Sequence, residues 1–381
     1  MADVARTRAN AALDRSRERR HRRRIQMRRI SAQALLPPSE EEVKEDRSAA
    51  IPPPLPPRPV AEWRNVVPFA GAVAVAGRQR HMEDALTIWP NLCSPKINRR
   101  LPVHYFAVFD GHGGSHFSLM CKRKMHKIVK EELMGVAPGE TEIGAGCPRG
   151  RPAPPPPEHI TNESDLQETW RILMNRVFAR SEMVALWTCG CGSEGFHCSC
   201  ERKSVTYEGT TAVAVVVTEK HFVVANCGDS RAVLYRSGRI IPLTFDHKPG
   251  RADEKARIEA SGGRVMHTDT ARVQGVLAMS RAIGDVFLKP YVISEPEVSF
   301  TRREEDDEFV IIASDGMWDV ISSEMAGRVA GNCLREPENQ GFSSRSSSAA
   351  SLLTRLALAR GTVDNISIIV VDLTRDAAAA A

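Results

Sequence analysis

The stretch VHYFAVFDGHGG, Val103–Gly114, sets the fold and also points to the site. Its hydrophobic first part predicts a short buried strand. Asp110, His112 and three glycines follow this strand directly. The glycines leave room for a ligand to approach the backbone, and the carbonyl of Gly111 is free to bind a metal ion. An acid, an imidazole and bare backbone at one strand end therefore indicate a functional site.

Other short runs rich in Val, Ile or Phe predict further strands. These strands are Ala70–Ala76, Thr211–Val217, Phe222–Ala225, Ala232–Tyr235, Glu308–Ala313 and Ile366–Leu373. The turn NCGDSR, Asn226–Arg231, is predicted to join two of them as a hairpin. Such a connection favours antiparallel sheets.

Helices are predicted between the strands because apolar residues recur at helical spacing. They cover Phe117–Val129, Leu166–Val177 after a capping box of Ser164 and Gln167, Ala252–Ala260 and Leu352–Leu358. The whole pattern predicts an α+β fold, a layered sandwich of two antiparallel β-sheets flanked by helices. Gly146–Glu158 and Ser343–Ser351 are predicted to be surface loops.

The chain divides into a tail, residues 1–65, and a globular body, residues 66–376. The tail holds a run of arginines, an acidic run and a proline run, which together predict disorder. Met1–Ile30 has eleven arginines and three acids, so the rest of the chain carries a net charge of −3. The arginines form either a nuclear-import or nucleic-acid-binding patch or a solvated basic tail, and an organellar transit peptide is a third reading. We expect the nucleus, the cytoplasm or both.

No apolar run approaches the roughly 18 residues of a membrane-spanning helix, and the basic start lacks a secretory signal. The nine cysteines are an odd number, as expected of reduced thiols in an intracellular protein. Cys189–Cys200, CGCGSEGFHCSC, is either a zinc site or a variable loop. Its Cys-x-Cys pairs lack the two-residue gap of structural zinc sites, which favours the loop.

Acidic residues recur at the ends of the predicted strands. Asp110, Asp229, Asp315 and Asp364 each stand at such an end, and Glu83 with Asp84 adds an acidic pair. One Asp-Gly pair is an ordinary turn signal, but strand ends of a sandwich gather at one rim. Converging carboxylates either share protons or bind hard divalent cations such as Mg²⁺ or Mn²⁺. An all-carboxylate set favours the ions, and therefore metal-assisted hydrolysis of a phosphate ester.

Ten motifs in this order resemble the type-2C metal-dependent protein serine/threonine phosphatases, in particular the plant members of the abscisic-acid-signalling clade. They are HMEDAL (81–86), VFDGHGG (108–114), GTTAV (209–213), ANCGDSRAVL (225–234), DHKP (246–249), RIEASGGRV (257–265), GVLAMSRAIGD (275–285), YVISEPEV (291–298), ASDGMWDV (313–320) and DNISIIVVDL (364–373).

This resemblance implies two Mg²⁺ or Mn²⁺ ions, with a weaker third. Carried over by motif, Asp110 would bridge two ions, and the Gly111 carbonyl, Asp315 and Asp364 would complete the direct ligands. Glu83 and Asp84 would bind directly or through waters, and Asp229 would lie near the third ion. His112 would be the general acid for the leaving oxygen. The resemblance also implies phosphorylated proteins as substrates, with protein kinases as further partners, and a monomer.

The sequence departs from this family at the phosphate-binding position. Family members carry an arginine three residues before the Met of MED, and here that residue is Gln79. If Gln79–Glu83 is extended, Arg78 and Arg80 point away from the site. We therefore expect weaker substrate binding with the metal ligands intact. An alternative is a catalytically weak phosphatase-like module that binds phosphoproteins or kinases, whereas nucleic acid is not an expected ligand.

A second departure concerns hormone receptors. Clade members that dock on abscisic-acid receptors place a tryptophan between GGRV and ARV, and here Thr268 stands in its place. Aromatic anchors of this kind dominate interfaces. We therefore expect weak or absent hormone-dependent inhibition through that contact.

Overall fold

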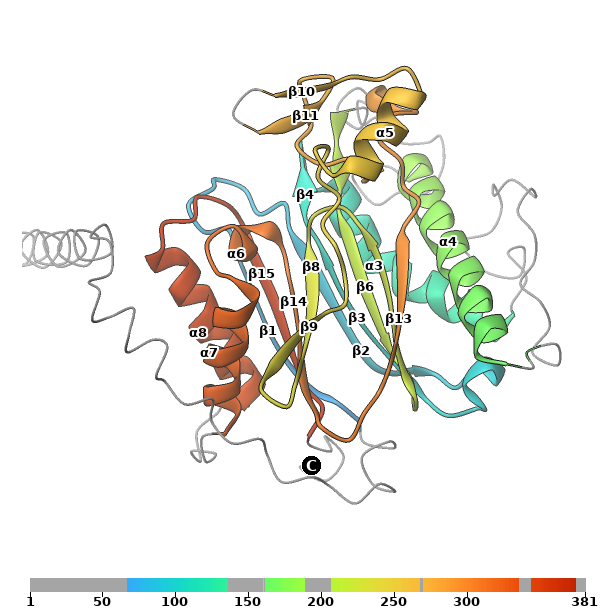
Figure 1. Cartoon of the computed structure of the whole chain (residues 1–381), viewed down its shortest axis with the longest axis vertical. Helices are drawn as coiled ribbons and strands as arrows, with labels where there is room; N and C mark the ends of the chain where they lie inside the picture. The colour runs from blue at the N-terminus through green and yellow to red at the C-terminus, as the bar shows by residue number, and fades with distance from the viewer. Residues whose placement is uncertain are drawn as a thin grey trace, which may run out of the picture. The chain divides into compact units, whose positions relative to one another are not determined.

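The computed structural model describes residues 67–135, 160, 162–188, 207–267, 270–335 and 344–374. Two five-stranded antiparallel sheets lie at its centre (Figure 1). The first sheet has the order β1-β15-β14-β8-β9, with bounds Phe69–Val75, Ile366–Asp372, Asp307–Ala313, Arg231–Arg236 and Arg239–Pro242. The second has the order β13-β7-β6-β3-β2, with bounds Glu297–Arg302, His221–Cys227, Ala212–Val217, Val103–Phe109 and Ala85–Cys93. The predicted α+β sandwich is confirmed.

Strand β3 shows why the opening stretch sets the fold, since all seven of its residues are buried. Phe106 and Val108 join the core between the two sheets. Tyr105 and Phe109 point the other way, into the core beneath the helices. Alternate side chains of a strand face opposite sides, so a strand in a middle layer must be apolar on both. Each fully buried Phe contributes about 1.5–3 kcal/mol relative to its exposed state.

Helices cover both outer faces of the sandwich (Figure 1). Helix α3, His116–Met134, packs on the second sheet, and α4, Glu163–Trp187, packs on α3. Helices α7, Ser323–Arg335, and α8, Arg345–Ala359, cover the first sheet. None of the described helices combines the length and the apolar character needed to span a membrane.

Helix α8 corrects the prediction of a surface loop at Ser343–Ser351. Ser344 caps the helix by accepting a hydrogen bond from the Ser347 N–H at 3.2 Å. The small residues that resemble a loop are needed for packing, since a Cβ at Gly71 on β1 would collide with the α8 backbone. Ala349 and Ala350 are buried in the same contact. Only small side chains permit so close an approach of helix and strand.

The predicted hairpin at Asn226–Arg231 is wrong. Strand β7 already pairs with β6 on one side and β13 on the other, so it has no free edge for β8. The chain instead crosses to the other sheet, where β8 pairs with β14 and β9. Gly228 lies at this crossing and has a φ of 123°, which disfavours any residue with a side chain. A Cβ at this position would also collide with Thr211.

Two local predictions also fail. Asn162, and not Ser164, caps α4, because its Oδ1 accepts from the Asp165 N–H at 2.9 Å. Strand β2 has no counterpart among the predicted strands, since Pro90 and Asn91 interrupt its apolar pattern. The pairing of β2 with β3 shifts register between Trp89 and Cys93, as expected for an edge strand that tolerates proline.

Smaller elements gather over the strand ends that bear the acids. They are β4 (Gly111–His112), β5 (Gly209–Thr210), α5 (Ala252–Ala260), β10 (Val265–His267), β11 (Ala271–Val273), β12 (Ile283–Gly284), η5 (Val286–Leu288) and α6 (Asp315–Trp318), while η2 (Lys96–Asn98) lies elsewhere. The predicted tail (1–65), the loop Gly146–Glu158, the Cys189–Cys200 segment and Thr268 lie outside the described residues.

Candidate metal and phosphate site

The predicted acids converge at one rim of the sandwich. Asp110 directly follows β3, and burial, together with the charges of Asp84, Asp315 and Asp229, raises its pKa well above the usual range. Burial also raises the pKa of Asp84 to about 6, and its Oδ2 accepts a hydrogen bond from Ser314 Oγ at 2.9 Å. Carboxylates in a low-dielectric site resist ionisation unless a cation neutralises them.

Asp364 and Glu83 complete this group at its solvent side. Asp364 is exposed, and its charge raises the pKa values of both Glu83 and Asp84, although burial has the larger effect on each. For Asp315, burial, followed by the charges of Asp229 and Asp319, raises the pKa to about 8. The structure thus brings all six predicted carboxylates together.

Asn365 holds the Glu83–Asp84 segment in place. Its Oδ1 accepts hydrogen bonds from the backbone N–H of Glu83 at 2.6 Å and of Asp84 at 3.3 Å. Its Nδ2 donates to the carbonyls of Ala76 and His81, both at 3.0 Å. A buried amide with both ends satisfied fixes this irregular segment next to the C-terminal strand.

Gly111 fits because the backbone of Glu83 lies against it. A Cβ at this position would stand 2.4 Å from the Glu83 carbonyl oxygen and 2.9 Å from Ser118 Oγ. Ser118 Oγ in turn donates a hydrogen bond to that carbonyl oxygen. Any larger residue would push the Glu83–Asp84 segment away from Asp110.

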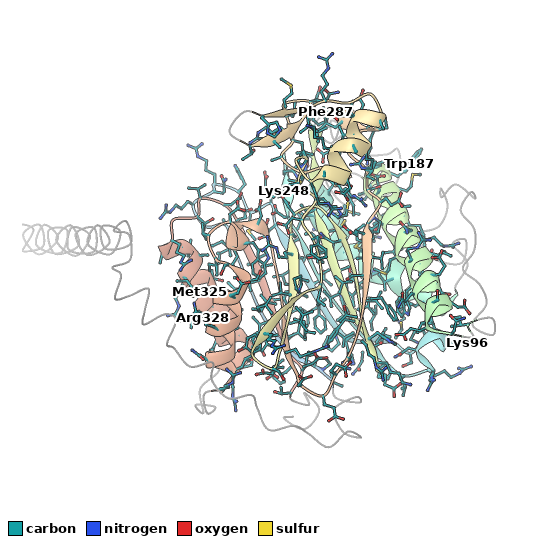
Figure 2. All side chains as sticks on the ribbon, in the orientation of Figure 1. Lys96, Trp187, Lys248, Phe287, Met325 and Arg328 are labelled. Carbon is teal, nitrogen blue, oxygen red and sulfur yellow. The ribbon has the colours of Figure 1, made fainter. Side chains whose placement is uncertain are left out.

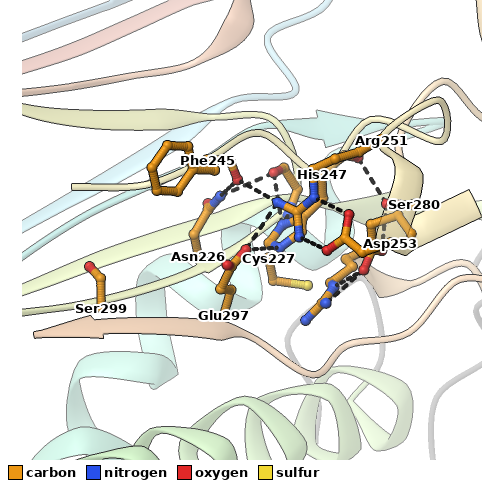
Figure 3. A network of polar contacts seen from close by, with 12 residues as sticks. Asn226, Cys227, Phe245, His247, Arg251, Asp253, Ser280, Glu297 and Ser299 are labelled. Carbon is orange, nitrogen blue, oxygen red and sulfur yellow. Dashed lines mark hydrogen bonds and ion pairs between the residues drawn. The ribbon is translucent and has the colours of Figure 1, made fainter. Parts of the chain in front are cut away.

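Asp229 is neutralised by a lysine that the sequence did not single out. Lys248 Nζ donates to Asp229 Oδ2 at 2.5 Å, and Asp229 is 1% exposed. The neighbouring His247 holds the lysine loop, since its Nδ1 accepts from the Gly228 N–H and its Nε2 bonds Glu297, both at 3.1 Å (Figure 3). Burial lowers the pKa of His247 to about 4, so the ring is neutral and fits this tautomer.

His112 meets a buried carboxylate that the sequence did not assign. Its Nε2 lies 2.7 Å from Asp285 Oδ2, and Asp285 is 1% exposed. Gly209 lies against this pair, because a Cβ there would stand 2.1 Å from Asp285 Oδ2 and 2.6 Å from His112 Nε2. With Nε2 bound to a carboxylate, Nδ1 is the nitrogen left to carry a transferable proton, and it is buried without a hydrogen-bond partner among the described residues.

The segment before the acids begins with a turn and forms no regular strand, so the condition that Gln79–Glu83 is extended is not met. The Gln79 N–H donates to the Ala76 carbonyl at 3.0 Å, and Gly77 has a φ of 61°. Arg78 Nη1 lies 3.5 Å from the Gly361 carbonyl oxygen at the end of α8, and Gln79 and Arg80 are exposed. Alternation along a strand therefore does not determine where Arg78 and Arg80 point.

The chemistry of these side chains fits divalent metal ions. Within the described ranges, no three His, Cys, Asp or Glu side chains already have the spacing of a metal site. However, Asp84 Oδ1 and Asp229 Oδ1 are buried without a hydrogen-bond partner in the described part of the chain. Orphaned carboxylate oxygens in a group that repels itself are the donors that Mg²⁺ and Mn²⁺ prefer.

These pKa values predict that the metal-free protein loses stability as the pH rises. The folded state keeps protons on Asp315 (pKa about 8) that the unfolded chain, with a pKa near 4, has already released. Buried His104 and His247, whose pKa values burial lowers to about 4, act in the opposite sense, but only below about pH 6.5. The melting temperature in chelator should therefore fall on the order of 5 °C from pH 6.5 to 8.5.

Calorimetry with and without Mg²⁺ tests this expectation. Saturating Mg²⁺ should flatten the pH dependence, because the ion compensates the ionised carboxylates. Asp315→Asn should flatten it without metal. A melting temperature that rises with pH in chelator would contradict the assignment.

Three supporting residues were missed by the sequence reasoning. Asp285 follows the short strand β12, so it shares the signal of an acid after a strand, but a two-residue strand is too short to detect. Lys248 lies in the motif DHKP, to which the sequence analysis assigned no role. Asn365 lies in DNIS, where only Asp364 was assigned one. Their partners lie far away in sequence or on another sheet, which no local pattern reveals.

Comparisons with known proteins agree with this geometry. The family model described as protein phosphatase 2C matches residues 70–135 and 194–366. "Probable protein phosphatase 2C 75" of Arabidopsis thaliana is 49% identical over 323 residues, covering 80% of this chain and 73% of that protein. "Probable protein phosphatase 2C 68" of Oryza sativa subsp. japonica is 46% identical over 309 residues, covering 80% and 78%.

Solved structures show the same fold. The crystal structure of serine-threonine phosphatase 2C from Toxoplasma gondii superposes with a TM-score of 0.62 at 23% identity, covering 84% of this chain and 97% of that one. A Caenorhabditis elegans sex-determining protein gives a TM-score of 0.58, also at 23% identity, covering 81% of this chain and 65% of that one.

Proposed function

The chain belongs to the protein phosphatase 2C family. The activity of this family is the metal-dependent hydrolysis of phosphoserine and phosphothreonine in proteins, and we propose how the residues of this chain carry it out. The observation that supports the proposal is the convergence of buried carboxylates around Asp110. Relatives with phosphatase names over most of the chain do not favour a module that only binds phosphoproteins.

We infer that this rim would hold two Mg²⁺ or Mn²⁺ ions, with Asp110 as a ligand. Asp84, the Gly111 carbonyl, Asp315 and Asp364 would be the other direct ligands, and Glu83 would act through water. When bound, the ions supply an activated water and offset charge on the phosphoryl oxygens. The protein's own part is to hold the acids at one rim and to fix the backbone of Glu83 and Asp84 through Asn365.

A weaker third ion near Asp229 has a competitor in this chain. Lys248 already supplies a positive charge at 2.5 Å from Asp229 Oδ2. Asp229 Oδ1 stays available. The lysine thus reduces the need for a third cation at this position.

His112 donates a proton to the leaving Ser or Thr oxygen in this proposal. An alkoxide is a poor leaving group, so a positioned acid contributes about 10²–10⁴-fold to such a step. Nδ1 is the nitrogen available for that proton, because Nε2 is bound to Asp285. Asp285 is therefore a positioning residue for His112.

Phosphate release from a phosphothreonine peptide tests the activity directly. We expect release with Mn²⁺ and none with chelator. Metal binding by calorimetry without any release would instead support the binding module.

Gln79→Arg should strengthen substrate binding. A guanidinium donates two parallel hydrogen bonds to a phosphate, and hydrogen bonds to charged groups contribute about 1.5–3 kcal/mol, which corresponds to a KM about 10- to 100-fold lower. Titration with a phosphothreonine peptide measures this, with Gln79→Lys as a control that adds charge without the fork. An unchanged KM would show that Gln79 does not face the phosphate.

The proposals for the protein's partners and its location in the cell are based on the sequence alone. We propose a monomer that acts on phosphoproteins and binds kinases, located in the nucleus or cytoplasm. Thr268 in place of the docking tryptophan would leave the enzyme resistant to hormone-loaded receptors. Strong inhibition by such a receptor would refute this part.

A further inference from the structure

A cavity of about 490 Å³ lies at the end of the second sheet away from the carboxylates. Its edge includes His221, the first residue of β7, whereas the other end of β7 leads to Asp229. The seven residues of β7 alone span roughly 20 Å. Figure 2 labels Lys248 near the carboxylate end and Lys96 near the cavity, toward opposite ends of the strands. The cavity is therefore separate from the phosphatase site.

Positive charge dominates the described lining of this cavity. Lys96, Arg99, Lys220 and Arg302 all line it, and none of them has an ion-pair partner within the part of the chain that the structure describes. Glu163 is the one carboxylate of the described lining, and its Oε1 lies 3.3 Å from His221 Nε2. Four cations that repel one another around one concavity call for an anionic ligand.

Short, hydrogen-bonded segments hold these cations. Arg302 and His221 are directly opposed residues of the β13–β7 pair. The Lys220 carbonyl accepts from the Arg303 N–H at 2.8 Å. Arg99 caps η2 in the left-handed region, with a φ of 54°, and its N–H donates to the Lys96 carbonyl at 2.9 Å. The backbone thus presents all four side chains from fixed positions.

The charges of Arg302 and Lys220 reach His221 at the edge of the cavity. Burial lowers the pKa of His221, Glu163 opposes this effect, and the charges of Arg302 and Lys220 lower the pKa further. Ile97 and Leu166 line the cavity too and pack against the main core, so they form an apolar support.

We propose that this cavity binds a compact anion that carries several phosphate groups. One phosphate monoester carries at most about −2, which four cations exceed. A cavity within the usual range of about 300–1,000 Å³ suits a small ligand better than a flat protein surface would. The same chemistry could be supplied by a free polyphosphorylated molecule or by a phosphorylated lipid headgroup.

Metal-free full-length protein is the right sample for the test. Without divalent ions the carboxylate rim repels phosphates, so binding there is suppressed. Inorganic tripolyphosphate is titrated by calorimetry, and its effect on the melting temperature is measured in parallel. Vesicles that contain a bisphosphorylated inositol lipid, compared with phosphatidylcholine vesicles, distinguish a headgroup from a free ligand.

The decisive variant is Lys220→Gln/Arg302→Gln, which changes one half-buried and one exposed side chain. Arg239→Gln/Arg355→Gln is the matched control, since it removes two exposed arginines of the first sheet and of α8. We expect tripolyphosphate affinity to fall at least about tenfold in the variant and not in the control. The tail arginines are present in all three proteins, and only cavity binding should raise the melting temperature.

Two results would overturn the proposal. Equal tripolyphosphate affinity and equal melting shifts in variant and control would show that the cavity binds no polyanion. A deca-glutamate peptide or single phosphate that binds as tightly as tripolyphosphate, and is lost in the variant, would show a site for another kind of anion. Because the test uses no metal and no turnover, its failure is independent of the phosphatase activity.

Discussion

Asp110→Asn is expected to lower kcat/KM for a phosphothreonine peptide on the order of 1,000-fold. Metal ions contribute several kcal/mol to transition-state stabilisation in hydrolysis of this kind, and each 1.36 kcal/mol is tenfold in rate. Asp110 lies among Asp84, Asp229 and Asp315, so no other single carboxylate can take its place. Phosphate release at saturating Mn²⁺, together with Mn²⁺ affinity by calorimetry, measures both effects.

The same substitution should stabilise the protein in chelator. Burial and three like charges raise the pKa of Asp110, and removing an uncompensated buried acid relieves that cost. Loss of activity with a higher melting temperature in chelator therefore distinguishes a lost ligand from a damaged fold. Glu305→Gln, an exposed acid at the far turn before β14, is the control and should leave both values unchanged. Retention of Mn²⁺-dependent activity in Asp110→Asn would refute the assignment.

The sequence predicted the layers because burial leaves a direct signature. Strand β3 has the predicted bounds Val103–Phe109, and its unbroken apolar run corresponds to burial on both faces. Asp110, Asp229, Asp315 and Asp364 were found for the same reason, since each lies next to a predicted strand, whereas Glu83 and Asp84 precede β2, which was not predicted. Site residues that lie next to a recognisable strand were therefore predictable from the sequence.

The connections and supports were not predictable, because they depend on contacts between distant residues. The crossing at Gly228 depends on β7 being paired on both sides, which the hairpin motif does not contain. The serines of α8 suggest a loop in the sequence, and only their packing against Gly71 explains why a helix has small residues there. Asp285 likewise gains its role only from His112, 173 residues away in the chain.

Asp285→Asn should slow hydrolysis in a way that depends on the leaving group. The Asp285 carboxylate accepts a hydrogen bond from His112 Nε2–H, which fixes the ring and leaves Nδ1 to carry the proton for the leaving oxygen. An amide keeps the shape and tolerates the φ of 47° at this position, but it carries no charge. A charge-assisted hydrogen bond contributes about 1.5–3 kcal/mol, so kcat for a phosphothreonine peptide should fall about 10- to 100-fold.

The nature of the leaving group separates this role from a structural one. The 4-nitrophenolate anion departs without a proton, so 4-nitrophenyl phosphate should be hydrolysed by the variant almost as fast as by the wild type. In a His112→Asn background, adding Asp285→Asn should cost little more, because the two residues act as a unit. Unchanged Mn²⁺ affinity by calorimetry would exclude a disturbed metal site. Equal losses for both substrates would mean that Asp285 supports the fold of the site and not the acid, since a general defect does not discriminate between leaving groups.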